Sequence, residues 1–230
     1  MLIACWSPKG GSGTTVIACG LAAVLARTSR AGGGALLADL CGDAASVLGL
    51  PDPSGPGLAE WLAAGPDVAA GALSRLEVEA GPGLGLLAWR RPAVELRPGP
   101  GRADALVEAL AADARAVVVD CGAATEGAGL AVAAAAPVSL LVLRPCYLAL
   151  RRALAAPLRP SGVVLVNEGG RALGRRDIED VLGVPVRAEV EVDPAVARAV
   201  DAGLLARRVP RALERALRGA VGAAAGRDAA

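Results

Sequence analysis

The sequence contains no histidine, and this absence removes several classes of catalytic and metal site. Ser-His-Asp triads, histidine general bases and zinc sites built on imidazole all need that side chain. Cysteines occur at an odd number of positions, and no two form a CxxC pair: Cys5, Cys19, Cys41, Cys121 and Cys146. Nothing resembling a secretory signal precedes them, so a reducing cytoplasm is the simplest expected compartment.

Lysine is nearly absent, because 23 of the 24 basic residues are arginine and Lys9 is the single lysine. If a positive charge alone were needed at this position, arginine would serve as it does elsewhere. The compact ammonium group of lysine, on its flexible side chain, contacts phosphates differently from a planar guanidinium, and this singles out Lys9. The net charge of +1 creates no overall field toward nucleic acid or acidic lipid, so no sequence-specific nucleic-acid partner is expected.

The longest uncharged run, residues 127–143, is alanine-rich and broken by Pro137. It is short of the roughly 20 residues that span a bilayer, and it predicts a helix followed by a buried strand. With 230 residues, 54% of them hydrophobic, the chain can bury a sizeable core. We therefore expect one domain over residues 1–218 and a flexible Ala/Gly-rich tail over 219–230.

Apolar runs of strand length alternate with stretches of helical periodicity along the chain. Continuous apolar strands separated by helices predict an α/β fold with a doubly wound, mostly parallel sheet covered on both faces. The expected strands are 2–6, 35–40, 84–89, 116–122, 138–143, 162–167 and 184–190. The expected helical segments are 14–27, a small excursion within 57–76, 102–114, 146–156, 175–182, 194–202 and 210–220. Turn-rich surface loops are expected at 51–57, 81–85 and 97–101.

The segment SPKGGSGTT, residues 7–15, joins the first expected strand to the first expected helix. Glycines there let backbone N–H groups converge on an anion at the start of the helix, which suits a phosphate. An ordinary phosphate-binding loop places lysine and then Ser/Thr after its last glycine, where this chain has Thr14 and Thr15. A glycine-rich turn without a ligand is the alternative. The candidate nucleotide-binding residues of the loop are Lys9, Gly10, Gly11, Ser12, Gly13, Thr14 and Thr15.

Two acids, Asp39 and Asp120, each end an expected strand. In combination with the loop they are candidates, with Thr15, for holding Mg²⁺. Taken singly, each acid has an alternative interpretation as an ordinary strand-end or helix-capping residue.

The loop resembles the deviant Walker loop, KGGxGK[ST], of the ParA/MinD ATPases. In that family the early lysine reaches across an ATP-sandwich dimer to the partner's nucleotide, and Lys9 matches it. Thr15 matches the magnesium-binding hydroxyl, whereas Thr14 replaces the usual phosphate lysine, so the Walker loop is degenerate. The resemblance implies ATP or ADP as ligand, Mg²⁺ as cofactor and a nucleotide-dependent homodimer.

The resemblance extends along most of the chain. LLADLCGD, residues 36–43, is similar to the family's LLVDxDxQ segment: Asp39 matches the first acid, and Cys41 stands where the acid that supports hydrolysis is found. VVVDCG resembles the Walker B strand, with Asp120 as its magnesium-side acid. VVLVNE, residues 163–168, resembles the strand whose asparagine contacts adenine, here Asn167, and residues 191–203 resemble the loop and helix that line the base pocket.

Within this superfamily, GGSGTT and LRPCYLALRR resemble the CpaE/TadZ branch and the septum-site-determining-like proteins of high-GC bacteria. Members of that branch place or organise pilus-assembly machinery. The resemblance implies a nucleotide-responsive switch or scaffold with weak or absent hydrolysis, in the cytoplasm or recruited to the inner face of the membrane or a cell pole. A slow ATPase for chromosome partition or septum-site placement is the alternative.

Two further features have alternative interpretations. Cys41, Cys121 and Cys146 all follow expected strands, so they would either form a metal or cluster site of a redox protein with a related fold, or serve as small buried hydrophobes. The last helix carries a thin apolar stripe and is either a membrane-surface helix, like that of MinD, or a docked terminal helix. Its stripe is Leu213, Leu217 and Val221, and its basic residues are Arg207, Arg208, Arg211, Arg215 and Arg218.

Overall fold

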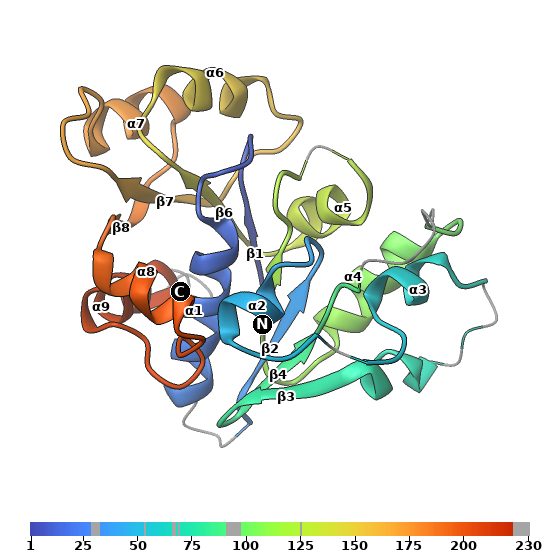
Figure 1. The fold of residues 1–230 in the computed structure, drawn as a ribbon. Helices are drawn as coiled ribbons and strands as arrows, with labels where there is room; N and C mark the ends of the chain where they lie inside the picture. Colours follow the sequence, from blue (N-terminus) through green and yellow to red (C-terminus); the bar gives the residue numbers. More distant parts are fainter. Residues whose placement is uncertain are drawn as a thin grey trace.

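In a computed structural model of the chain, strand β1 (Leu2–Trp6) lies inside an eight-stranded sheet of order β3-β4-β2-β5-β1-β6-β7-β8 (Figure 1). The structure describes residues 1–28, 33–52, 54–65, 68, 70–90, 98–124 and 126–222. Neighbouring strands are parallel except for β3 and β4. The other strands are β2 (Ala35–Asp39), β3 (Glu77–Gly81), β4 (Leu84–Leu87), β5 (Ala116–Asp120), β6 (Val138–Leu143), β7 (Gly162–Asn167) and β8 (Val186–Glu191). The expected doubly wound α/β fold is confirmed.

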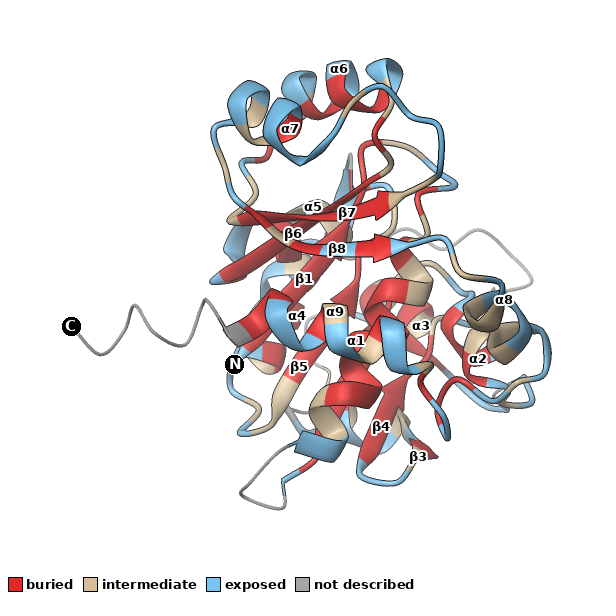
Figure 2. Cartoon of the chain, turned by 90° about the vertical axis from the view of Figure 1, so that its left-hand side faces the viewer, coloured by how far each residue is buried: buried red, intermediate tan, exposed pale blue. Residues whose placement is uncertain are grey.

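Helices cover both faces of the sheet, and each face has its own core (Figures 1 and 2). One face is covered by α1 (Thr14–Thr28), α2 (Ala44–Leu48), α8 (Pro194–Asp201) and α9 (Arg211–Gly222). The other is covered by α3 (Leu58–Ala63), α4 (Arg102–Ala111), α5 (Gly127–Ala135), α6 (Tyr147–Ala155) and α7 (Arg175–Leu182). Two short 3₁₀ helices, η1 (Ala70–Ala72) and η2 (Ser74–Leu76), precede β3. No helix within the described ranges is long and apolar enough to cross a membrane.

Burial on both faces explains why the strands are apolar without alternation. In β1, Ile3 and Cys5 pack into the core beneath α1, whereas Leu2, Ala4 and Trp6 pack into the opposite core. Strand β1 pairs with both β5 and β6, so its carboxyl end lies between two other parallel strand ends. Ligand sites of doubly wound sheets lie at this edge, and the glycine loop leaves β1 there.

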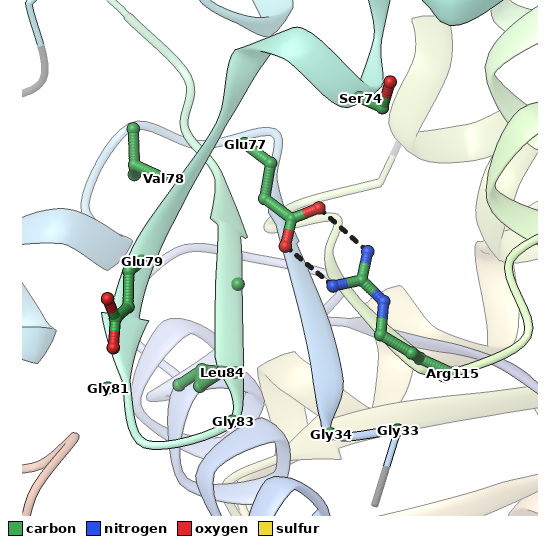
Figure 3. A pocket seen from close by; sticks show the side chains of 11 residues that line it. Gly33, Gly34, Ser74, Glu77, Val78, Glu79, Gly81, Gly83, Leu84 and Arg115 are labelled. Carbon is green, nitrogen blue, oxygen red and sulfur yellow. Dashed lines mark hydrogen bonds and ion pairs between the residues drawn. The ribbon is translucent and has the colours of Figure 1, made fainter.

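Besides the five-residue helix α2, the edge strand β3 is an element that the sequence did not predict. Its burial is partial, and Glu77 and Glu79 interrupt the apolar run that marks the central strands. The guanidinium of Arg115 holds the strand in place by a bidentate ion pair with Glu77, with N–O distances of 2.7 and 2.8 Å (Figure 3). The expected surface loop at 81–85 is accordingly the turn of the β3–β4 hairpin together with the adjoining strand residues. An edge strand needs only one apolar face, which explains the missing signal.

The apolar stripe of α9 is buried against α1 and β8. Leu213 and Leu217 are almost fully covered, and the side chains of both lie against Gly20 of α1. The helix is therefore a docked terminal helix, and its stripe is not available to a membrane surface. It continues through Gly222, so the first four residues of the expected tail are helical, and residues 223–230 lie outside the described part.

Two glycines meet where the end of α2 touches the turn after α8. Gly49, the C-cap of α2, has φ 75°, and a Cβ there would lie 2.1 Å from the Gly203 carbonyl oxygen. We expect Gly49→Ala to lower the free energy of unfolding by about 2–4 kcal/mol, through left-handed strain plus a backbone clash. The matched control is Gly183→Ala at the C-cap of α7, where φ is 66° but the space is open; it should cost about 1–2 kcal/mol. If urea denaturation gave the same loss in free energy of unfolding for both variants, the close contact between Gly49 and Gly203 would be contradicted.

Candidate functional site

The loop between β1 and α1 is shaped by two left-handed glycines and by bonds to a single carbonyl group. Gly11 and Gly13 have φ of 78° and 85°, which side-chain-bearing residues rarely adopt. The hydroxyls of Ser7 and Ser12 donate to the Lys9 carbonyl oxygen at 2.7 and 3.3 Å. The loop is thus held in a fixed curve by its own side chains.

The inside of this curve presents unpaired donors. Within the described part of the chain, the backbone N–H groups of Gly10, Gly11, Ser12 and Gly13 make no hydrogen bond. A Cβ added at any of the three glycines would meet nothing within 4 Å, so the space before the loop is open. Because α1 begins at Thr14, the positive end of its dipole adds to these donors. Unpaired donors at the start of a helix suit an anion.

Lys9 is half-buried at the start of the loop. Its Nζ lies 3.5 Å from the carbonyl oxygen of Gly10, and among the described residues no carboxylate forms an ion pair with it. The ammonium group is therefore available to an anionic ligand. Thr14, at the position of the usual phosphate lysine, is buried with 6% of its surface exposed, and it supplies no charge.

Asp120, at the end of β5, is fully buried and only partly satisfied. Its Oδ1 accepts a hydrogen bond of 3.1 Å from the Gly122 N–H, whereas its Oδ2 has no partner within the described residues. Burial raises the pKa of Asp120 from 3.8 to about 6, the charge of Asp39 adds to the shift, and the nearby Thr15 hydroxyl opposes it. An unpaired buried carboxylate oxygen beside a hydroxyl fits a hard divalent cation such as Mg²⁺.

The raised pKa of Asp120 predicts a stability change with pH. Between about pH 4 and pH 6 the folded protein binds more protons than the unfolded chain, so the free energy of unfolding should fall as pH rises through this window. Asp120→Asn should therefore stabilise the protein by about 1–3 kcal/mol at pH 7.5, with the difference shrinking below pH 4. It should also weaken Mg²⁺-dependent nucleotide binding. The measurement is denaturant unfolding across this pH range, with Asp52→Asn at an exposed position as the control. If both variants changed the free energy of unfolding by the same amount at every pH, the raised pKa of Asp120 would be refuted.

Asp39, the candidate metal ligand at the end of β2, also caps the next segment. Its Oδ1 accepts from the N–H groups of Cys41 and Gly42, each at 2.8 Å, and its Oδ2 accepts from that of Ala44 at 3.0 Å. Burial raises its pKa, and these three bonds oppose the rise. Asp39 thus closes the turn after β2 and also accepts from the first residue of α2, whose N-cap is Asp43; one lone pair on Oδ2 remains for a cation.

Cys41 lies next to both acids. Its Sγ donates to the Asp120 carbonyl oxygen at 3.5 Å, and it sits against Gly122, where an added Cβ would lie only 2.4 Å from the sulfur. Ligand atoms of Asp39, Cys41 and Asp120 all lie within 4.8 Å of one another. Burial, with the neighbouring carboxylates, raises the pKa of the Cys41 thiol.

The three cysteines that follow strands do not gather into one site. Cys121 belongs to the core on the α4–α7 face, and its thiol donates to the Val119 carbonyl oxygen at 3.9 Å. Cys146, half-buried before α6, joins no metal-ligating group within the described residues. The interpretation as small apolar residues therefore holds for Cys121, and the three-cysteine site is not formed.

A cavity of about 320 Å³ lies beside the loop, between α1, the ends of β7 and β8, and α8. Its size is at the lower end of small-molecule pockets. Five lining positions lie outside the residues that the sequence analysis assigned to a nucleotide site: Val16, Ile17, Arg144, Val190 and Leu213. Arg144 immediately follows β6, so its place at a strand end was the available signal. The remaining lining residues are Gly13, Val166, Glu191, Val192, Asp193, Val196, Ala197, Val200 and Asp201.

Asn167, the expected base contact, ends β7 next to this cavity. Its Nδ2 donates to Glu189 and Glu191 of β8, at 3.2 and 3.1 Å. The amide is thus placed at the expected strand end and is already occupied by two carboxylates. Contact with a base would use its Oδ1 or exchange one of these bonds.

Comparison with known proteins finds this fold among solved ATPases. The Pyrococcus furiosus cell division ATPase MinD superposes with a TM-score of 0.77 at 23% identity over 96% of both chains. The septum site-determining protein MinD of Pyrococcus horikoshii OT3, solved with Mg-ADP, gives 0.76 at 20% identity over 96% of this chain and 95% of that one. A ParA family ATPase from Chlorobium tepidum TLS gives 0.76 at 20% identity over 97% of both. No protein-family model and no curated sequence matches the chain. At these identities the fold is shared.

Proposed function

We propose that this protein is a ParA/MinD-type nucleotide-binding switch that dimerises on ATP and organises a cellular machine, with weak or absent hydrolysis. The observation that carries the proposal is the run of unpaired N–H groups from Gly10 to Gly13 at the start of α1. These donors suit a phosphate, and a neighbouring cavity suits the rest of a nucleotide.

Each part of the site has a role in holding ATP or ADP. The backbone of residues 10–15 and the ammonium group of Lys9 bind the phosphates. The cavity receives the base; its lining includes Val166 and Glu191, which are the sequence neighbour and the strand partner of Asn167. Thr15, Asp39 and Asp120 are the residues that would hold Mg²⁺, which when bound neutralises phosphate charge. Asp120 offers the unpaired Oδ2, and Asp39 offers one remaining lone pair.

Dimerisation is the proposed output of binding. Lys9 matches the early lysine that reaches the partner's nucleotide in the ParA/MinD ATPases, and we infer the same role here. The lack of an ion-pair partner for Lys9 in the described part of the chain supports this role. The homodimer would recruit a protein partner in a positioning apparatus, for which pilus assembly is the specific proposal. The site of action is the cytoplasm, with recruitment to the inner face of the membrane or a cell pole.

The outer face of α6 is the surface that best suits such a partner. Tyr147, Leu148 and Leu154 are exposed to 71, 53 and 59% of their full area, and Arg151 lies over the Tyr147 ring at 5.8 Å. Residues 127–167 contain no acidic side chain. A protein surface with both apolar and acidic residues would complement this face.

A slow ATPase for chromosome partition or septum placement is the second candidate, favoured by the names of the proteins that share the fold. The rate of ATP hydrolysis by the purified protein distinguishes this candidate from the weakly hydrolysing switch. A cysteine-based redox protein is disfavoured because Cys41, Cys121 and Cys146 do not converge.

The test of the proposal is calorimetric titration of the purified protein with ATP and with ADP, each with and without Mg²⁺, beside light scattering. We expect one nucleotide per chain, tighter binding with Mg²⁺, and a doubling of mass with ATP but not with ADP. Absence of heat and of any mass change at millimolar nucleotide would refute it.

A further inference from the structure

We propose that Asp39, Cys41 and Asp120 form a binding site for a thiophilic divalent cation, of the Zn²⁺ or Co²⁺ class, which the protein takes up without nucleotide. This goes beyond a magnesium ion that accompanies ATP, because Mg²⁺ prefers oxygen ligands and does not select a thiol.

The three side chains come from two neighbouring strand ends and offer one sulfur and two carboxylates. Their ligand atoms lie within 4.8 Å of one another. Two ligands of one tetrahedral zinc ion are separated by about 3.3–3.6 Å, so side-chain rotations that bring the ligand atoms about 1 Å closer together would close the site. Three protein ligands leave the fourth tetrahedral position for water.

Asp120 supplies the independent sign that a ligand is missing. Its side chain is fully buried, and Oδ2 has no hydrogen-bond partner among the described residues, although buried carboxylate oxygens are normally paired. Leaving such an oxygen unpaired costs free energy, and a cation bound there would remove the cost.

The surroundings fix the ligands as a metal site requires. Three backbone N–H groups hold the Asp39 carboxylate, and the Gly122 N–H holds Oδ1 of Asp120. Such outer contacts orient metal ligands. The sulfur of Cys41 is seated against Gly122, where any larger residue would displace it. Cys41 is only half-buried, which gives a cation a path from solvent, and on binding its thiol proton leaves to solvent.

The test is titration of the purified, reduced full-length protein with Co²⁺ in the absence of nucleotide, followed by absorption spectroscopy. We expect one Co²⁺ per chain and a near-ultraviolet sulfur-to-cobalt charge-transfer band that Zn²⁺ removes. About 100-fold excess Mg²⁺ should leave the band in place, because it lacks affinity for sulfur. Failure here would leave the nucleotide proposal untouched, since no nucleotide is present.

Variants assign the ligands. Cys41→Ser and Cys41→Ala should both abolish the band while circular dichroism stays unchanged, and Cys146→Ser, which changes another half-buried cysteine, should keep it. Asp120→Asn should weaken Co²⁺ binding at least about tenfold. The proposal is overturned if the parent protein shows no band, if the folded Cys41 variants retain it, or if Asp120→Asn binds Co²⁺ as tightly as the parent.

Discussion

Phosphate release from ATP by the purified protein is expected to stay at the uncatalysed background. Phosphoryl transfer is accelerated by groups that neutralise charge moving between phosphate oxygens and by groups that position the attacking water. Thr14 supplies no cation where an ordinary phosphate-binding loop has its lysine, and Cys41 supplies a protonated thiol where the resemblance to the ParA/MinD ATPases implies a carboxylate. Losing one preorganised group costs about 10²–10³ in rate, so both losses together remove most of the acceleration.

The restoring experiment is a comparison of Thr14→Lys, Cys41→Asp and the double variant by continuous phosphate assay. The double variant should exceed the parent by at least about tenfold, and each single variant should recover less, because both groups act on one transition state. The control is the double variant carrying Asp120→Asn as well, in which the gain should disappear. Robust turnover by the unmodified protein would contradict the weak-hydrolysis proposal.

Lys9→Ala is expected to abolish ATP-dependent dimerisation at micromolar protein. Hydrogen bonds to charged groups contribute about 1.5–3 kcal/mol each, so losing the ammonium group weakens the dimer by about 10–100-fold. Lys9→Arg should recover only part of the affinity, because a planar guanidinium does not fit the place of a compact ammonium group. Light scattering with ATP, with ADP and without nucleotide is the measurement.

Arg176→Ala is the matched control for Lys9, since it removes one positive charge from an exposed position on α7. It should dimerise as the parent does. If Lys9→Ala and Lys9→Arg both dimerise normally on ATP, the lysine does not reach the second copy's nucleotide and the sandwich arrangement is wrong.

The central fold was predictable because its strands are buried on both faces. β1, β2 and β5 read as unbroken apolar runs, and the long apolar stretch after the glycine loop marked α1, whereas the five-residue helix α2 was not predicted. β3 was not predictable from apolar runs, since Glu77 and Glu79 interrupt it; the strand pairs with β4, and the Arg115–Glu77 ion pair adds a contact between partners 38 residues apart. Local sequence carries no sign of such a contact.

The candidate site also has parts that the sequence predicts and parts that it does not. The glycine loop and the strand-end acids were found from spacing, because loop and acids sit at the carboxyl ends of parallel strands. The hydrogen-bond partners of the polar side chains could not be predicted from the sequence. The Asp39 carboxylate turned out to cap its own turn, and Asn167 turned out to face Glu191 across the strand pair. These bonds depend on strand register and side-chain rotation.

The central claim, that a nucleotide binds at the glycine loop, is tested most directly by equilibrium binding of a fluorescent ATP analogue to Gly10→Ala. Gly10 has no left-handed backbone, and a methyl group there meets no protein atom within 4 Å, so the fold should be unaffected while the methyl enters the phosphate space. Gly71→Ala, equally open and in η1 away from the loop, is the control. We expect the parent and Gly71→Ala to bind alike and Gly10→Ala to bind at least about tenfold more weakly, the effect of about 1.4 kcal/mol. Equal binding by all three proteins would place the nucleotide elsewhere and contradict the account.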